Sequence, residues 1–145
     1  MLFRGEWLAG SDGVARPIIR LHVTRPDGTQ FVAPFLVDSG ADATIFSHDV
    51  LLQLGVPTAP GSAGTLQGVG GQTACIVVQS TLTFTQEDSN TGSFTGNFGS
   101  FLSPDASEIS LLGRDVLNNF EVIISYRLRC VLFLTLPHAW LVGTA

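Results

Sequence analysis

The alternation of apolar and polar residues along the chain predicts β-strands over most of its length. Residues 16–24 (RPIIRLHVT) and 30–38 (QFVAPFLVD) have the pattern of two strands, and the Pro-Asp-Gly sequence between them is typical of a tight turn. Residues 64–85 predict two more strands around a glycine-rich tip, Gly68 to Gly71. The same pattern predicts further strands at residues 93–102, 109–113, 121–126 and 130–134.

Two short segments have helical rather than strand spacing. In residues 47–55, Ser47 is suited to begin a helix, Val50, Leu51 and Leu54 fall at helical spacing, and Gly55 is suited to end it. Residues 114–120 (RDVLNNF) predict a second helix of about two turns. No repeat or linker divides the chain, so we expect one mainly β domain over residues 1–145, with a core at about 17–135. The strands are expected to form a small closed or partly closed barrel.

Composition narrows the possible partners. Hydrophobic residues make up 45% of the chain and charged residues 13%, which favours a packed core over disorder. The net charge is −5, with seven Arg and no Lys, so there is no broad basic face and we expect no nucleic-acid partner. No apolar segment reaches the roughly 20 residues of a membrane-spanning helix, so we expect no membrane insertion and a cytoplasmic protein.

Cys75 and Cys130 lack metal-binding spacing and are expected to be buried thiols.

Candidate chemistry centres on Asp38, which follows the apolar run Phe35–Val37. A serine-nucleophile role for Ser39 is disfavoured, because too little chain precedes it for a two-barrel serine protease. The histidines are too scattered to predict a metal site: His22, His48 and His138. A carboxylate at a strand end can serve acid/base chemistry when a second carboxylate shares its proton. The alternative from the tripeptide alone is an Asx turn in which Asp38 only caps its loop.

Three segments together resemble the retroviral-type aspartic proteases, the retropepsins. The stretch FLVDSGADATIF resembles their active-site segment, LQGVGG resembles their flap, and SLLGRDVLNNF resembles the segment that opens their C-terminal helix. The three segments occur in the family's order and cover about residues 17–135. The ending GRDVLNNFEVIISY looks closer to cellular and prokaryotic members than to viral ones.

The resemblance implies a retropepsin-like closed barrel that is active as a homodimer, because the chain has a single Asp-Ser-Gly. It implies an aspartic endopeptidase in which two Asp38 carboxyls activate water at the dimer axis and hydrolyse an extended polypeptide, without metal or cofactor. Ser39 would bond the partner loop, and Gly40 would let the backbone approach substrate. The alternative is an inactive retropepsin-fold module for dimerisation or peptide binding.

The resemblance also assigns supporting residues. Asp42 matches an acidic position that contacts substrate main chain and pairs with the arginine matched by Arg114, a pair that gives structural support if buried. The flap would comprise Gly68, Val69, Gly70 and Gly71. We expect the substrate pocket to be lined by Leu36, Ala41, Val69 and Leu112.

Overall fold

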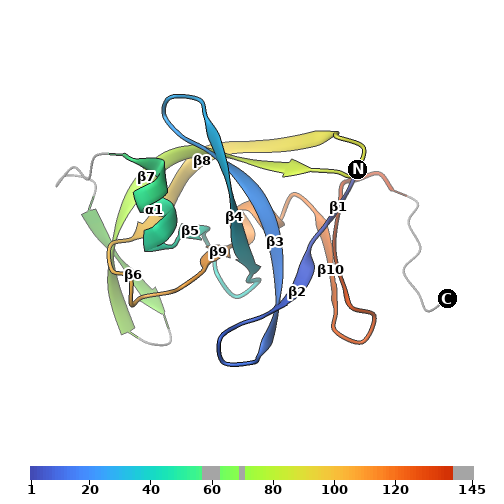
Figure 1. Ribbon diagram of the computed structural model, residues 1–145, viewed down its shortest axis with the longest axis horizontal. Coiled ribbons are helices and arrows are strands. Elements are labelled where there is room, and N and C mark those ends of the chain that lie inside the picture. The colour runs from blue at the N-terminus through green and yellow to red at the C-terminus, as the bar shows by residue number, and fades with distance from the viewer. Residues whose placement is uncertain (57–62, 69–70, 139–145) are drawn as a thin grey trace.

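The computed structural model describes residues 1–56, 63–68 and 71–138, with the side chains of 63–68 and 71–73 outside the description. This part of the chain is mainly β (Figure 1). The two helices are α1 (His48–Leu54) and α2 (Arg114–Leu117). The strands are β1 (Leu2–Arg4), β2 (Glu6–Ala9), β3 (Ala15–Thr24), β4 (Gln30–Val37), β5 (Ile45–Phe46), β6 (Ala63–Gly68), β7 (Gly71–Thr85), β8 (Thr91–Phe101), β9 (Ser110–Leu112), β10 (Glu121–Ser125) and β11 (Cys130–Leu134).

The predicted hairpin of residues 16–38 is confirmed as β3 and β4, which pair from Ile18 opposite Leu36 to Thr24 opposite Gln30. Its turn is fixed by local chemistry. The Asp27 carboxylate accepts a hydrogen bond from the Thr29 N–H at 2.9 Å, and Gly28 adopts a positive φ of 86°.

The larger sheet closes on itself. Its strands follow the order β2-β3-β4-β9-β5-β8-β7-β6, and β7 also pairs with β3, so six of these strands form a ring. The core inside this ring is apolar and includes the fully buried Phe35, Phe46, Leu82 and Leu112. The barrel expected from the strand pattern is therefore present. Strand β5 was not predicted, because two residues are too few to give a periodic signal.

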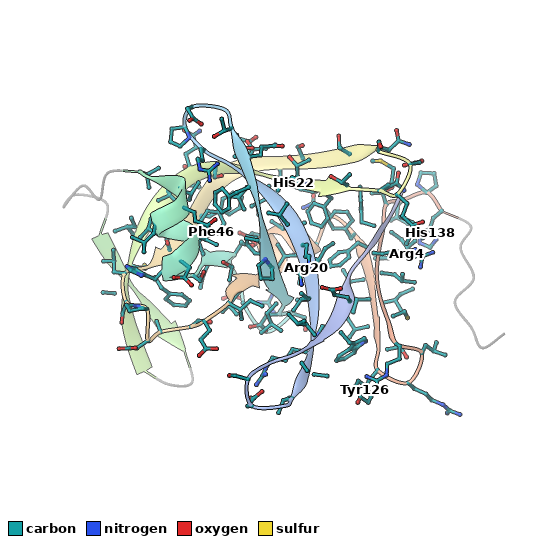
Figure 2. The ribbon with its side chains drawn as sticks, viewed as in Figure 1. Arg4, Arg20, His22, Phe46, Tyr126 and His138 are labelled. Carbon is teal, nitrogen blue, oxygen red and sulfur yellow. The ribbon has the colours of Figure 1, made fainter. Side chains whose placement is uncertain are left out.

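A second sheet has three strands in the order β1-β11-β10. The predicted β10–β11 hairpin is confirmed, whereas β1 and β2 were missed. The side chain of Trp7, on β2, fixes this sheet to the barrel: its Nε1 donates to the carbonyls of Ser125 and Cys130 at 3.2 and 3.3 Å. The Trp7 ring also lies edge-on to Tyr126, which sits at the outer end of the hairpin (Figure 2).

The two helices differ in how well the sequence predicted them. In α1 the Ser47 hydroxyl accepts from the Val50 N–H, and Gly55 ends the helix in the left-handed conformation, both as predicted. The prediction of two turns for residues 114–120 is wrong, since α2 has four residues. After α2 the backbone changes to the tighter i→i+3 pattern, in which the Asn119 and Phe120 N–H groups donate to the Val116 and Leu117 carbonyls at 3.1 and 3.0 Å.

Of the two cysteines that were expected to be buried, one is buried and one is not. Cys75 is buried as expected, but Cys130 is partly exposed, and neither forms a disulfide. Cys130 begins β11 directly after the hairpin turn, whose residues 126–129 are exposed. Within the described residues, neither helix has the length or apolar character to cross a membrane.

Candidate active site

Asp38 lies directly after β4, where this strand runs parallel to β9. The parallel pairing ends with Val37 beside Leu112, and the Asp38 N–H then donates to the Leu112 carbonyl at 3.1 Å. Parallel neighbours bring the segments after both strands to the same edge of the sheet. The loop that follows Asp38 and the helix that follows β9 therefore lie together.

The Asp38 carboxylate caps its own loop. Oδ1 accepts a hydrogen bond from the Gly40 N–H at 3.0 Å, and the Asp38 carbonyl accepts from the Ala41 N–H at 3.1 Å. The Asx turn considered in the sequence analysis is therefore present, but it uses only one of the two carboxylate oxygens of Asp38. Among the described residues, Oδ2 has no hydrogen-bond partner, and Asp38 is only partly buried. The loop geometry therefore leaves one oxygen available for chemistry.

The start of α2 holds the Asp38 loop from one side. The Arg114 N–H donates to the Ala41 carbonyl at 2.9 Å, and the Asp115 N–H donates to the Asp42 carbonyl at 3.2 Å. The Arg114 side chain forms an ion pair with Asp42 and contacts the Ser39 carbonyl at 3.4 Å. Ser39, Gly40 and Asp42 of the same loop are exposed.

The structure brings Arg114 and Asp42 together as the resemblance implied, but not in a buried setting. The Asp42 side chain is 86% exposed and that of Arg114 49% exposed. An ion pair this open is screened by water and contributes little to stability, about 0–1 kcal/mol. In this chain other residues support the loop, through hydrogen bonds that are buried or part-buried.

Thr44 and Asp115 provide that support, and neither was singled out from the sequence. Thr44 is fully buried, and its N–H and hydroxyl donate to the Asp115 carboxylate at 3.0 and 2.7 Å. The Thr44 hydroxyl also accepts from the Gly113 N–H at 3.0 Å. The one sequence signal is a polar Thr directly before the apolar pair Ile45–Phe46, which predicts a buried hydroxyl with a partner.

Gly113 allows the loop and α2 to approach this closely. A Cβ atom at Gly113 would lie 2.4 Å from the carbonyl carbon of Ala43 and 2.5 Å from its oxygen. Both contacts are to backbone, so no side-chain rotation would relieve them. A glycine is required at this position by packing rather than by its own dihedral angles.

The structure gives different outcomes for the predicted flap residues and the predicted pocket residues. Gly68 pairs with Gly71 at the end of the β6–β7 hairpin, while Val69 and Gly70 lie outside the described residues. Leu36 and Ala41 are partly exposed, as a pocket wall requires. The prediction for Leu112 is wrong: its side chain is fully buried in the barrel core, because the Leu112 position of β9 faces inward.

The sequence of this chain matches a family model, and its fold is similar to solved structures. A family model described as retroviral aspartyl protease matches residues 14–125. The crystal structure of a retropepsin-like aspartic protease from Rickettsia conorii is similar over 92% of this chain and 90% of that chain, with 16% identity and a TM-score of 0.53. The EIAV protease in complex with the inhibitor HBY-793 matches over 71% of this chain and 86% of that chain, with 19% identity and a TM-score of 0.48. No curated protein sequence matches the chain.

Proposed function

Because the chain belongs to the retroviral aspartyl protease family, we propose that it is an aspartic endopeptidase whose active site forms when two copies each supply Asp38. The family and the mainly β retropepsin-like fold expected from the sequence are confirmed. The catalytic residue, the dimer and the single domain of residues 1–145 are our proposals.

The observation that carries this proposal is that the Asp38 loop is held in place and yet exposed beside Asp38. Arg114 and Asp115 hold the loop at Ala41 and Asp42 through backbone hydrogen bonds, while Ser39 and Gly40 are exposed. The chain contains one Asp-Ser-Gly, so a second catalytic carboxyl of this type has to come from another copy. Two-fold symmetry brings a residue near the axis to its own counterpart, which makes Asp38 face Asp38.

In such a pair, two carboxyls about 3 Å apart share one proton, because both cannot ionise so close together. The ionised Asp38 takes a proton from a water molecule, and the protonated Asp38 donates a hydrogen bond to the scissile carbonyl oxygen. Water attacks the carbonyl carbon, and the tetrahedral intermediate collapses as the departing amine takes up a proton. No covalent bond to the enzyme forms. The Gly40 N–H fixes the orientation of each carboxylate through Oδ1.

Other residues have supporting roles in this proposal. Ser39 bonds the backbone of the partner loop, and Gly40 presents its carbonyl to an extended polypeptide substrate. Asp42 contacts the substrate main chain, which fits its exposed side chain and its fixed pairing with Arg114. The hairpin of β6 and β7 serves as the flap, excluding water from the site.

The test compares wild type with Asp38→Asn on a diverse peptide library between pH 4 and 7, by sequencing the cleaved ends. Asp27→Asn is the matched control, because Asp27 is exposed in the β3–β4 turn, at the opposite end of β4 from Asp38. We expect wild type and Asp27→Asn to cleave alike and Asp38→Asn to lose cleavage by at least about 100-fold. If none of the three proteins cleaves the library although all are folded and dimeric, the result would favour the inactive module for dimerisation or peptide binding. Cleavage that persists in Asp38→Asn would exclude Asp38 as the catalytic residue.

A further inference from the structure

The turn between β10 and β11 forms a well-ordered tip at one end of the molecule. It consists of residues 126–129 (YRLR), all exposed, and we call these four residues the hairpin tip. The Arg129 N–H donates to the Tyr126 carbonyl at 3.2 Å, and the Leu128 N–H donates to the Ser125 hydroxyl at 3.1 Å. Figure 1 shows that this turn lies at the end of its hairpin, beyond the strands of the barrel. The tip therefore presents its side chains outward on a fixed backbone.

The hairpin tip carries two arginines that have no carboxylate partner. Four of the seven arginines of the chain form ion pairs with carboxylates: Arg4, Arg16, Arg20 and Arg114. Arg25 donates to the Gln53 carbonyl at 2.8 Å. Within the described residues, Arg127 and Arg129 form no ion pair and no side-chain hydrogen bond. Residues 125–130 also contain no Asp or Glu, so the tip is a positive point on a chain whose net charge is −5.

Arg129 has an uncommon backbone conformation. Its φ of 51° lies in the left-handed region, which strains residues that carry a Cβ and favours glycine. The Arg129 guanidinium carbon lies 4.0 Å from the centre of the Tyr126 ring, and this ring packs edge-on against Trp7. An exposed charged residue held in a strained conformation indicates a role beyond closing the turn.

We propose that the hairpin tip docks on an anionic lipid surface. Arg127 and Arg129 would contact lipid phosphates, and Leu128 and Tyr126 would enter the headgroup region. Guanidinium groups bind phosphate through paired N–H donors, and aromatic rings with a polar end favour the membrane interface. The Leu128 side chain, between the two arginines, is 36% exposed, and that of Tyr126 is 54% exposed.

A lipid surface accounts for the apolar side chains as well as for the charges. A soluble acidic peptide would use the two arginines but would leave Leu128 and Tyr126 exposed to water. Bound peptides usually lie in a groove or along a strand edge, whereas this contact is the end of a hairpin (Figure 2). The observations therefore favour a lipid surface as the partner.

The net charge of −5 does not prevent this contact but limits its strength. Charges are screened over about 8 Å at physiological ionic strength, so at the surface the two arginines of the tip act more strongly than distant carboxylates. Two charges and two apolar side chains give weak, reversible binding. We expect this binding to weaken further as salt is added.

Co-sedimentation with lipid vesicles tests the proposal. One set contains phosphatidylglycerol and phosphatidylcholine in equal amounts, and the other contains phosphatidylcholine alone. We expect wild type to bind the mixed vesicles at low ionic strength, to bind them less at physiological ionic strength, and to leave the neutral vesicles in solution. Absence of binding to the mixed vesicles at low ionic strength would overturn the proposal, and so would equal binding to both sets.

Substitutions then locate the contact. Arg127→Gln should lower the affinity for mixed vesicles about 5-fold, and Arg127→Lys should keep most of it. Arg20→Gln is the matched control, because it removes the same charge from an arginine that pairs with Glu6 on another part of the surface. Circular dichroism should show that all variants are folded. An equal loss in Arg20→Gln and Arg127→Gln would mean that overall charge, and not the tip, governs binding, which would overturn the proposal.

Leu128→Ala separates a lipid surface from a soluble acidic partner. We expect it to lower the affinity for mixed vesicles about 3- to 10-fold, because less apolar surface leaves water. Soluble poly-glutamate, the acidic probe, should bind wild type and Leu128→Ala equally weakly. Unchanged vesicle binding in Leu128→Ala, or poly-glutamate binding as tight as vesicle binding, would overturn the lipid assignment. None of these variants alters the Asp38 loop, so peptide cleavage in solution should match wild type whatever the vesicle result.

Discussion

Replacing Thr44 by valine tests how the Asp38 loop is supported. Thr44 is fully buried, and valine has nearly the same shape without the hydroxyl. The substitution removes the 2.7 Å hydrogen bond to the Asp115 carboxylate, and it leaves the Gly113 N–H without its acceptor. A hydrogen bond to a charged group contributes about 1.5–3 kcal/mol, and a stranded buried N–H costs about 1–3 kcal/mol. We therefore expect a loss of about 3 kcal/mol in the free energy of unfolding.

The assay is urea unfolding followed by circular dichroism. A protein of this size has a denaturant slope of about 2 kcal/mol per molar urea, so the midpoint should fall by roughly 1.5 M. Thr81→Val is the matched control, because the Thr81 hydroxyl bonds Thr95 at 2.7 Å on an exposed face of β7 and β8. That variant should stay within about 1 kcal/mol of wild type. All samples need one protein concentration, since dimerisation stabilises the folded state by mass action.

The reasoning would be refuted if Thr44→Val and Thr81→Val unfolded at the same urea concentration. Such a result would mean that the buried contacts around Thr44 add nothing beyond an exposed cross-strand pair. A change in the denaturant slope would instead indicate an altered denatured state, which a repeat by thermal unfolding would reveal.

Three further predictions concern Gly113, Asp115 and the pair of Arg16 and Asp12. Gly113→Ala should lower the free energy of unfolding by several kcal/mol or prevent folding, because its Cβ would lie 2.4 Å from backbone. Gly96→Ala is the control: its Cβ would lie 3.6 Å from a side chain, so its free energy of unfolding should stay near that of wild type in the same urea assay. Asp115→Asn keeps an acceptor oxygen and should destabilise less than Asp115→Ala, measured by thermal unfolding. The Arg16 guanidinium, which bonds Asp12, holds the pKa of Asp12 well below 3.8, so its stabilising effect is full above pH 4 and is lost as the pH falls below that value. NMR titration should show the pKa of Asp12 returning toward 3.8 in Arg16→Gln.

The sequence predicted elements whose signals are local. The hairpin of residues 16–38 combines alternation with a Pro-Asp-Gly turn, and both act within a few residues. This placed Asp38 at the end of a strand. β1 and β2 gave no such signal, because they are three and four residues long and β1 is held by β11 at the far end of the chain. α2 was overestimated because residues 114–120 have helical spacing, whereas the backbone changes to i→i+3 hydrogen bonds after Leu117.

The site residues also differ in whether a local sequence signal predicts them. The exposed pair of Arg114 and Asp42 was expected from a family resemblance that supplied the long-range information. The part-buried contact of Thr44 with Asp115 joins residues 71 positions apart, and no local pattern in the chain links them. Thr44 gave only a weak signal as a polar residue before an apolar pair. Loop support of this kind becomes visible only when the fold brings β9 beside β4.

The Asp38 loop leaves one polar group without a partner among the described residues, the second carboxylate oxygen of Asp38. Burying such a group alone would cost about 1–3 kcal/mol, so a single copy keeps it at its surface. A two-fold association gives this oxygen a partner in the second Asp38 carboxyl, because symmetry repeats every contact. On the proposed function, cleavage and dimerisation must therefore fall together on dilution, with one midpoint.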